Sequence, residues 1–374
     1  MTTEIDEEFA EADFGDKRLD RRLTKVARRL RATPGASIPQ SMKSDGELEG
    51  TYRFLRHPEV SPDRILAPHI AATCRRTVES GAFVVAHDTS HFYFSTPRDG
   101  LGRGTNDRED GRVFYGHVAL AASLDGKRTP LGVLGAETFV REGKAKKKRN
   151  RHTEKTPEPQ RESSRWWKMV EHVEQQLGPS SGAIHVMDRE ADQYLLLSRM
   201  VGANCRFVIR ISHDRRIKAE EKERTLKHAL ESLQGRFTQE VPLTAKTPKP
   251  SAARRGVPKQ TRNATLTFTA TEVELLLPST KVKTRYKMPK SIKVNVVHVV
   301  ETEPPDGYPP IDWKLQTTEP IESTEDIKRI IEAYRTRWVI EEFFKALKTG
   351  CAFEKRQLES AKTIFNALAV FLPI

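Results

Sequence analysis

The feature that most constrains this chain is a regular succession of apolar runs and amphipathic segments in its middle. Three strand-like runs are followed by helix, strand, helix and strand patterns, at residues 82–88, 116–123, 130–140, 163–177, 183–188, 191–202 and 206–211. Short apolar runs rich in β-branched residues are typical of buried strands. The order predicts an α/β fold, in which a mixed sheet carries helices on its faces.

The flanking segments differ in pattern from this core. Residues 17–31 form a basic amphipathic helix pattern, and further helices are expected over 46–57 and after Pro62. Residues 212–320 contain a helical pattern at 219–233 and alternating strands at 265–277 and 291–300. We therefore expect four regions: a small all-helical N-terminal domain (1–75), a first part of the α/β core (76–211), a β-rich insertion (212–320) and a final core helix (321–374).

The charge of the chain indicates a polyanionic partner. The sequence has 64 Lys and Arg against 51 Asp and Glu, a formal net charge of +13. The excess of positive charge is concentrated in residues 17–31, 144–152 and 246–262. Such clusters favour nucleic acid as the partner. The alternative is an enzyme with a merely basic surface.

Composition excludes several other classes. The acidic N-terminus is unlike a secretory signal, and no apolar stretch reaches the roughly 18 residues of a membrane span. Cys74, Cys205 and Cys351 are far apart, which argues against a disulfide framework or a cysteine zinc site. A cytoplasmic protein fits this pattern.

Two aspartates stand at expected strand ends. Asp88 and Asp188 each follow an apolar run, and α/β sheets bind ligands beyond the carboxyl ends of their strands. A helix cap or a turn is the alternative for each. Within 188–192 we prefer Asp188 over Glu190 and Asp192, because acids are common in a first helical turn for electrostatic reasons alone.

The helix expected over 330–350 has ionisable residues on its core-facing side. At about 100° per residue, Tyr334, Arg337, Glu341 and Lys348 share a stripe about 60° wide. The residues bordering this stripe are apolar: Ile327, Ile330, Trp338 and Phe344. Burying such charges is costly unless they are paired or used. The alternative is a surface ion pair between Arg337 and Glu341, with Glu342 as a solvated neighbour.

Three carboxylates in a basic protein suggest a site for Mg²⁺, which prefers oxygen ligands. Two such ions can clamp a phosphodiester and activate the attacking oxygen, with Arg337 and Lys348 stabilising the negative charge. A zinc site at His87 and His91 would need a helix, whereas this segment has a strand pattern.

At these residues the chain resembles a known family. The pattern Y-x2-R-x3-E-x6-K, filled by Tyr334, Arg337, Glu341 and Lys348, is similar to the signature of bacterial cut-and-paste DDE transposases of insertion sequences. The resemblance extends to RWVIEEFFKALKTG, to VMDREAD around Asp188, to HDTS and to EGTYRFLRHP. It covers nearly all of residues 13–374.

The resemblance implies a ribonuclease-H-like catalytic core, an N-terminal domain that binds the transposon ends, and a β insertion before the catalytic Glu. It implies that Asp88, Asp188 and Glu341 are the catalytic, metal-binding triad, with Mg²⁺ as the cofactor and Mn²⁺ as a substitute. The DNA-binding residues implied in the same way are Tyr334, Arg337, Lys345, Lys348, Trp313, Arg210 and Arg53. Trp313 would stack on a flipped base.

The family reaction implied is hydrolytic nicking, hairpin formation and joining of the freed 3′ end to target DNA. Its partners are double-stranded DNA and a second subunit in a synaptic homodimer, at the bacterial nucleoid in the cytoplasm. Family members continue through a further C-terminal helical region, so we expect the apolar end NALAVFLPI to be exposed and the dimer to be weakened. Two alternatives stay open: a DNA-binding inhibitor without catalysis, and a structure-specific nuclease on the same fold.

Overall fold

A computed structural model of the chain describes residues 4–104, 109–141, 162–178, 181–218, 224–243, 262–278, 288–304 and 310–374. The chain forms two compact units. The first unit comprises Met1–Ala183 and Thr336–Ile374, and the second unit comprises Ile184–Arg335.

The first unit begins with five helices: α1 (Glu4–Glu8), α2 (Lys17–Ala32), α3 (Ile38–Ser41), α4 (Asp45–Arg56) and α5 (Pro62–Ser80). Side chains of Asp16, Ser44 and Ser61 cap α2, α4 and α5 by accepting hydrogen bonds from first-turn amides. The helices expected over 17–31 and 46–57 are confirmed. The helix expected after Pro62 is confirmed as α5, which runs to Ser80.

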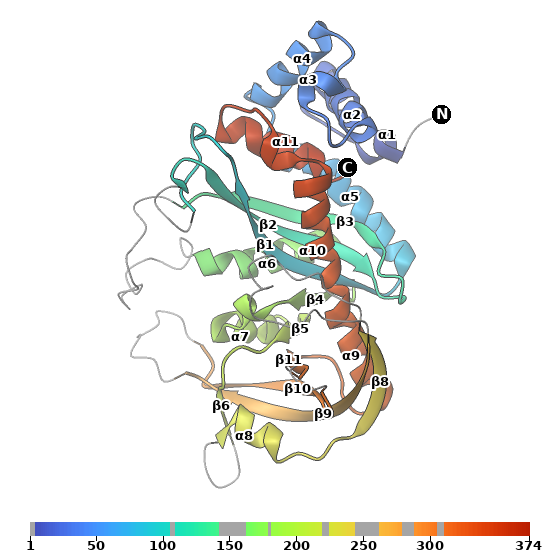
Figure 1. Cartoon of the computed structure of the whole chain (residues 1–374), viewed down its shortest axis with the longest axis vertical. Coiled ribbons are helices and arrows are strands. Elements are labelled where there is room, and N and C mark those ends of the chain that lie inside the picture. Colours follow the sequence, from blue (N-terminus) through green and yellow to red (C-terminus); the bar gives the residue numbers. More distant parts are fainter. Residues whose placement is uncertain are drawn as a thin grey trace. The chain divides into compact units, whose positions relative to one another are not determined.

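Three antiparallel strands form the sheet of the first unit: β1 (Phe83–Tyr93), β2 (Val113–Ser123) and β3 (Pro130–Phe139). Helices cover both of its faces (Figure 1). Val118 belongs to an apolar cluster shared with α5, α10 (Trp338–Lys345) and α11 (Ala361–Phe371). Ala119, the next residue, belongs to a second cluster with α6 (Arg165–Leu177), which follows the short turn η4 (Glu162–Ser164). Successive strand residues point to opposite faces, so the sheet lies between these two helix layers.

The C-terminal segment is a buried part of this core. We expected NALAVFLPI to be exposed, and this expectation is wrong. Ala367 to Leu372 are all buried, and α11 packs against α4 and α5. The buried Asn366 amide donates hydrogen bonds to the carbonyls of Leu55 and Val60, at 2.9 and 3.1 Å. The apolar composition of this segment is therefore explained by its place inside the first unit.

The second unit contains a mixed sheet. β4 (Ile184–Met187) pairs in parallel with β5 (Arg206–Arg210), and α7 (Tyr194–Gly202) connects them. The sheet continues with antiparallel neighbours, in the order β5, β11 (Asp312–Thr317), β10 (Ser291–Glu301) and β9 (Arg262–Leu276). The strands expected in the insertion thus extend the sheet that begins with β4 and β5.

The remaining elements of the second unit are β6 (Arg216–Ile217), β7 (Arg224–Thr225), α8 (Leu226–Glu231), β8 (Phe237–Leu243) and α9 (Thr324–Thr336). Within the described residues, the helix expected over 219–233 is reduced to the short α8. The basic segment 144–152 lies outside the described residues, and so does 246–262 apart from Arg262, which pairs with Glu301. None of the helices in the described ranges combines the length and apolar character that crossing a bilayer requires.

We predict that Asn366→Ala lowers the free energy of unfolding by about 1–3 kcal/mol, because it leaves two buried carbonyls without their donor. Urea denaturation measures this change. The matched control is Lys362→Ala on the exposed side of α11, which should change stability by less than about 0.5 kcal/mol. Equal effects of the two variants would contradict the observed packing.

A second prediction concerns α1 and pH. Burial opposes ionisation of Glu8, but hydrogen bonds from His69 and Arg76 outweigh it and lower the pKa of Glu8 from 4.5 to about 2. A depressed carboxyl pKa stabilises the folded state above pH 4.5, and this stabilisation is lost as the pH falls from 4.5 towards 2. Glu8→Gln should therefore lower the urea midpoint at pH 6 and weaken its decline below pH 4.5. The exposed Glu7→Gln should leave both unchanged.

Candidate active site

Asp88 lies in the middle of a strand. It is the sixth residue of β1, opposite Val118 of β2, so the expectation that it ends its strand is wrong. The strand continues to Tyr93, and the buried Phe92 between the exposed His91 and Tyr93 packs in the core. The polar residues around Phe92 hid this alternation in the sequence. Asp88 itself is 24% exposed, and its Oδ1 accepts a hydrogen bond from the amide of Thr89 at 2.7 Å.

Arg337 joins two of the predicted carboxylates within the first unit. Its Nη1 lies 3.6 Å from Oδ2 of Asp88, and its Nη2 lies 2.5 Å from Oε1 of Glu341. The guanidinium is only 12% exposed, whereas the Glu341 side chain is 35% exposed. The pair of Arg337 and Glu341 is therefore not a surface pair, because a buried strand supplies a second acid to the same cation.

Lys348 completes this charged group. Its Nζ donates a hydrogen bond to the carbonyl of His91, lies 3.9 Å from Oε1 of Glu354 and sits 5.0 Å from the centre of the Phe92 ring. Burial lowers the pKa of Lys348, and the negative charges of Glu354 and Asp88 oppose that shift. Asp88, Arg337, Glu341 and Lys348 thus form one cluster, which we call the charge cluster.

The expected long helix is divided into segments. α9 ends at Thr336, α10 begins at Trp338, and a π-helical turn, η6 (Ala346–Gly350), carries Lys348. A constant 100° step does not hold across such a turn. Trp338, expected to border the buried stripe, is 42% exposed and donates a hydrogen bond to Glu342. Ile327, Ile330 and Phe344 are buried as predicted.

A polar network on the opposite face of β1 was not found from the sequence. The Thr89 hydroxyl contacts Nδ1 of the buried His117 at 2.8 Å and accepts a hydrogen bond from Arg165 of α6 at 2.9 Å. Burial, and secondly the charge of Arg165, lower the pKa of His117 to about 3, so the ring is neutral. This network fixes the backbone that carries Asp88. The sequence signal was a lone arginine in the helix pattern of residues 163–177.

Asp188 belongs to the second unit, directly after β4. It caps the short helix η5 (Arg189–Ala191), with its Oδ1 accepting a hydrogen bond from the amide of Glu190 at 2.8 Å. The strand-end position predicted from the sequence is confirmed, and the cap is observed as well. Its convergence with Asp88 and Glu341 stays a prediction.

Three more predicted residues also lie in the second unit. The rings of Trp313 on β11 and Tyr334 on α9 contact edge to face, with centroids 6.1 Å apart. Arg210, the last residue of β5, donates to the carbonyl of Asp312 at 3.4 Å. The structure therefore places Trp313 beside Tyr334, with Arg210 bonded to the residue before Trp313.

The two remaining predicted residues lie on exposed helix surfaces. Arg53 is on α4, where its side chain is 74% exposed and pairs with Glu49 one turn earlier. Lys345 is the last residue of α10 and is exposed. Within the described residues, no side-chain contact links Arg53 or Lys345 to the charge cluster.

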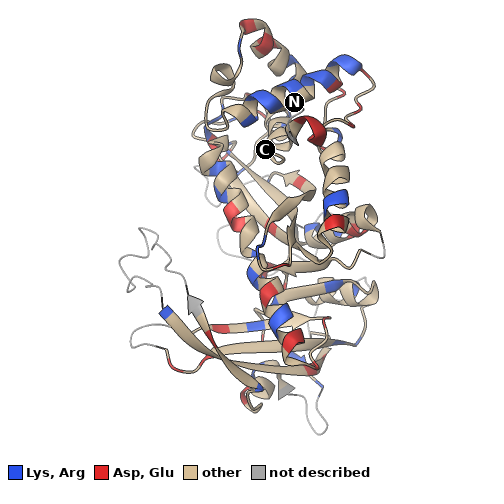
Figure 2. Ribbon diagram, turned by 90° about the vertical axis from the view of Figure 1, so that its right-hand side faces the viewer, with Lys and Arg blue, Asp and Glu red and all other residues tan. Residues whose placement is uncertain are grey.

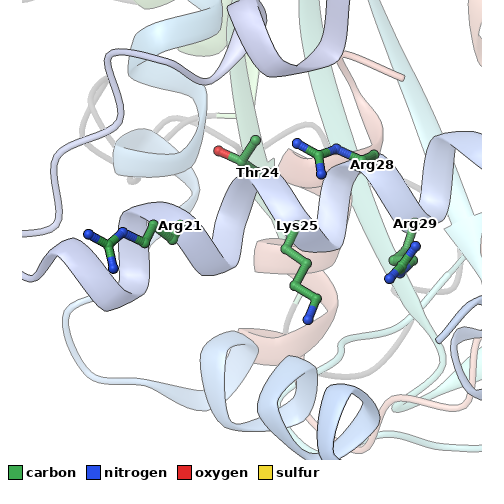
Figure 3. A pocket seen from close by; sticks show the side chains of 5 residues that line it. All are labelled: Arg21, Thr24, Lys25, Arg28 and Arg29. Atoms are coloured by element: carbon green, nitrogen blue, oxygen red, sulfur yellow. The ribbon is translucent and has the colours of Figure 1, made fainter. Parts of the chain in front are cut away.

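The basic helix α2 forms a surface of its own. Basic residues recur along the N-terminal helices (Figure 2). A pocket on α2 is lined by Arg21, Thr24, Lys25, Arg28 and Arg29 (Figure 3). Lys25 and Arg29 both bind Glu47 of α4, with the Arg29 pair at 2.9 Å and the Lys25 pair at 2.8 Å. These ion pairs hold α4 against the basic helix, and Arg21 and Arg28 are exposed on α2.

Two segments of the chain match models of known protein families. Residues 1–60, which contain α1 to α4, match the model of a transposase DNA-binding family. Residues 152–371, which contain Asp188, Arg337 and Glu341, match the model of the transposase DDE domain. Asp88 lies between the two matched segments. Because the second match covers more than half of the chain, the chain belongs to the DDE transposase family.

We predict that Arg337→Gln lowers the free energy of unfolding by about 1–3 kcal/mol, because two partly buried carboxylates lose their shared cation. Arg335→Gln is the matched control, since Arg335 is more exposed and pairs only loosely with Glu332 at 3.5 Å. That control should cost less than about 0.5 kcal/mol. Thermal denaturation at low ionic strength measures both, and an unchanged midpoint for Arg337→Gln would contradict the ion pairs.

Proposed function

We propose that this transposase nicks DNA at the ends of its element by metal-dependent hydrolysis and joins the freed 3′-hydroxyl to target DNA. The observation that carries the proposal is the charge cluster. Two acids distant in sequence, Asp88 and Glu341, meet at one guanidinium beside a partly buried lysine. A ribonuclease-H-like core, which the helix layers on both faces of a sheet support, is part of this proposal.

Asp88, Asp188 and Glu341 would hold the metal. Asp88 and Glu341 are 24% and 35% exposed, so both carboxylates are accessible to an ion. Their oxygen atoms suit Mg²⁺ better than a softer metal, and Mn²⁺ accepts the same ligands. Among the described residues no group of three His, Cys, Asp or Glu side chains is close enough to form a metal site, so the third ligand is an inference. When bound, two such ions polarise the phosphodiester and activate the attacking oxygen.

The cations of the charge cluster, Arg337 and Lys348, would have a role separate from metal binding. Arg337 brings positive charge to within 4 Å of Asp88 and Glu341, and Lys348 lies close enough for the charge of Asp88 to act on its pKa. These cations would offset the extra negative charge of a reacting phosphate, which the acids would otherwise repel. The partial burial of both side chains reduces screening by water. Lys345 would bind the same DNA strand from the exposed side of α10.

Binding of DNA would involve both units. Arg21, Lys25 and Arg28 on α2, together with Arg53 on α4, offer exposed cations for the phosphates. In the second unit, Tyr334 and Arg210 would contact the DNA end, and Trp313 would stack on a flipped base. We further propose that two copies of the chain pair on DNA, that a hairpin forms on the cleaved end, and that the reaction takes place at the nucleoid.

The test is cleavage of duplex DNA taken from the flanks of the encoding element, with Mg²⁺ and with Mn²⁺. Asp88→Asn, Asp188→Asn and Glu341→Gln should each reduce cleavage by about 100-fold or more, the order lost when one charge-stabilising group is removed. Glu342→Gln is the matched control, because this exposed acid points away from the charge cluster towards Trp338. Denaturing gels separate nicked, hairpin and joined products.

Two outcomes would favour the alternatives. A chain that binds the end DNA but never cuts it would indicate an inhibitor of transposition. Cutting that ignores the end sequence would indicate a structure-specific nuclease. Full cleavage by Glu341→Gln would contradict the assignment of the triad itself.

A further inference from the structure

Asp192, the last acid of the segment 188–192, is the centre of a buried hydrogen-bond network in the second unit. Its side chain has no exposed surface. Its Oδ1 accepts from Nη2 of Arg215 at 2.6 Å and from Nε2 of Gln316 at 2.8 Å. Its Oδ2 accepts from the amides of Ser212 and His213 at 2.7 and 2.9 Å. Both oxygen atoms are therefore fully used by protein donors.

Because protein donors occupy both of its oxygen atoms, Asp192 has a role different from that of Asp188. A carboxylate has about four acceptor positions, and here at least four donors occupy them. Arg215 is only 8% exposed and also donates to the backbone carbonyl of Asp192 at 2.8 Å. Burial opposes ionisation of Asp192, but Arg215 and the other donors outweigh it and lower its pKa. Asp192 is thus a charged, permanently bonded anchor with no lone pair left for a metal.

The anchor is coupled to Asp188 through a single short turn. Asp188 begins η5, and Asp192 ends it by donating its amide to the carbonyl of Arg189 at 3.3 Å. The Ser212 hydroxyl contacts the same carbonyl at 3.3 Å. The turn that presents Asp188 is therefore fixed at its far end to the loop after β5 and, through Gln316, to β11.

We propose that Asp192 is a positioning residue that holds the Asp188 carboxylate in its metal-binding orientation. The proposal rests on the proposed function, since it needs Asp188 to be a ligand. Residues that orient a ligand through a hydrogen-bonded frame commonly change metal affinity or activity by about 10–100-fold when they are replaced. Asp192 does so through the backbone of the turn, without touching the metal or the DNA.

The first experiment measures the turn without metal or DNA. Asp192→Asn should speed amide hydrogen exchange at residues 188–193 and 211–216 by about tenfold or more, while β1 and β2 stay protected. Asp214→Asn is the matched control: the same replacement in the loop after β5, at an exposed acid that accepts a hydrogen bond from the amide of Lys227. Unchanged exchange in Asp192→Asn would overturn the proposal, whether or not the chain cuts DNA.

The second experiment measures the site. Binding of Mn²⁺, followed by electron paramagnetic resonance, and the Mg²⁺ dependence of end cleavage should both shift by about tenfold or more in Asp192→Asn. Binding of end DNA in the absence of metal should be unchanged. If the wild-type chain neither binds Mn²⁺ nor cleaves DNA, the proposed function fails, and hydrogen exchange still tests the anchor.

A double variant separates positioning from simple stability. Asp192→Asn leaves the buried Arg215 without its counter-charge, and this alone destabilises the fold. Asp192→Asn with Arg215→Met removes that conflict and should restore the melting temperature while the metal dependence stays shifted. Recovery of both the melting temperature and the metal dependence would show that Asp192 serves only stability, and would overturn the proposal.

Discussion

The charge cluster depends on one physical constraint: two carboxylates can share a partly buried place only beside a compensating cation. Arg337 supplies that cation to Asp88 and Glu341. Without that cation, two like charges in a region of reduced dielectric constant would repel each other strongly. The arrangement holds because α10 packs on β1, where Phe92 and Phe344 meet edge to face with ring centroids 6.3 Å apart. Apolar packing thus sets the distance between the two acids, and the positive charge of Arg337 offsets their repulsion at that distance.

The two aspartates are fixed by different means. Asp88 sits within a paired strand, and the network of Thr89, His117 and Arg165 secures the backbone from the opposite face. Asp188 follows a strand of four residues and depends on a turn, which Asp192 ties to the neighbouring loop. A paired strand is rigid because its ladder is continuous, whereas a turn needs side-chain donors. Each unit therefore secures its acid with a buried polar network suited to the local backbone.

Sequence patterns predicted the elements well where a single periodicity governed them. The strand and helix order from 82 to 211 is confirmed, and so are the capped helices α2 and α4. Predictions from the periodicity were wrong where a second structural feature interrupted it. Polar residues around Phe92 concealed the second half of β1, and the π-helical turn before Gly350 broke the constant helical step. The C-terminal segment looked exposed because the surfaces that cover it, on α4 and α5, lie about 300 positions earlier in the chain.

The sequence by itself determined which residues are candidates for the chemistry, because motif spacing and charge are local properties of the chain. Arg337, Glu341 and Lys348 were predicted to share one helix face, and Asp188 to follow a strand. Only the tertiary structure decided which acids are available to a ligand and which are structural. Asp188 and Asp192 stand four positions apart in one acidic segment, yet of these two only Asp192 is fully buried with both oxygens accepting hydrogen bonds from distant residues. Those donors come from residues about 20 to 124 positions away. A local sequence pattern cannot reveal contacts between residues so far apart in the chain.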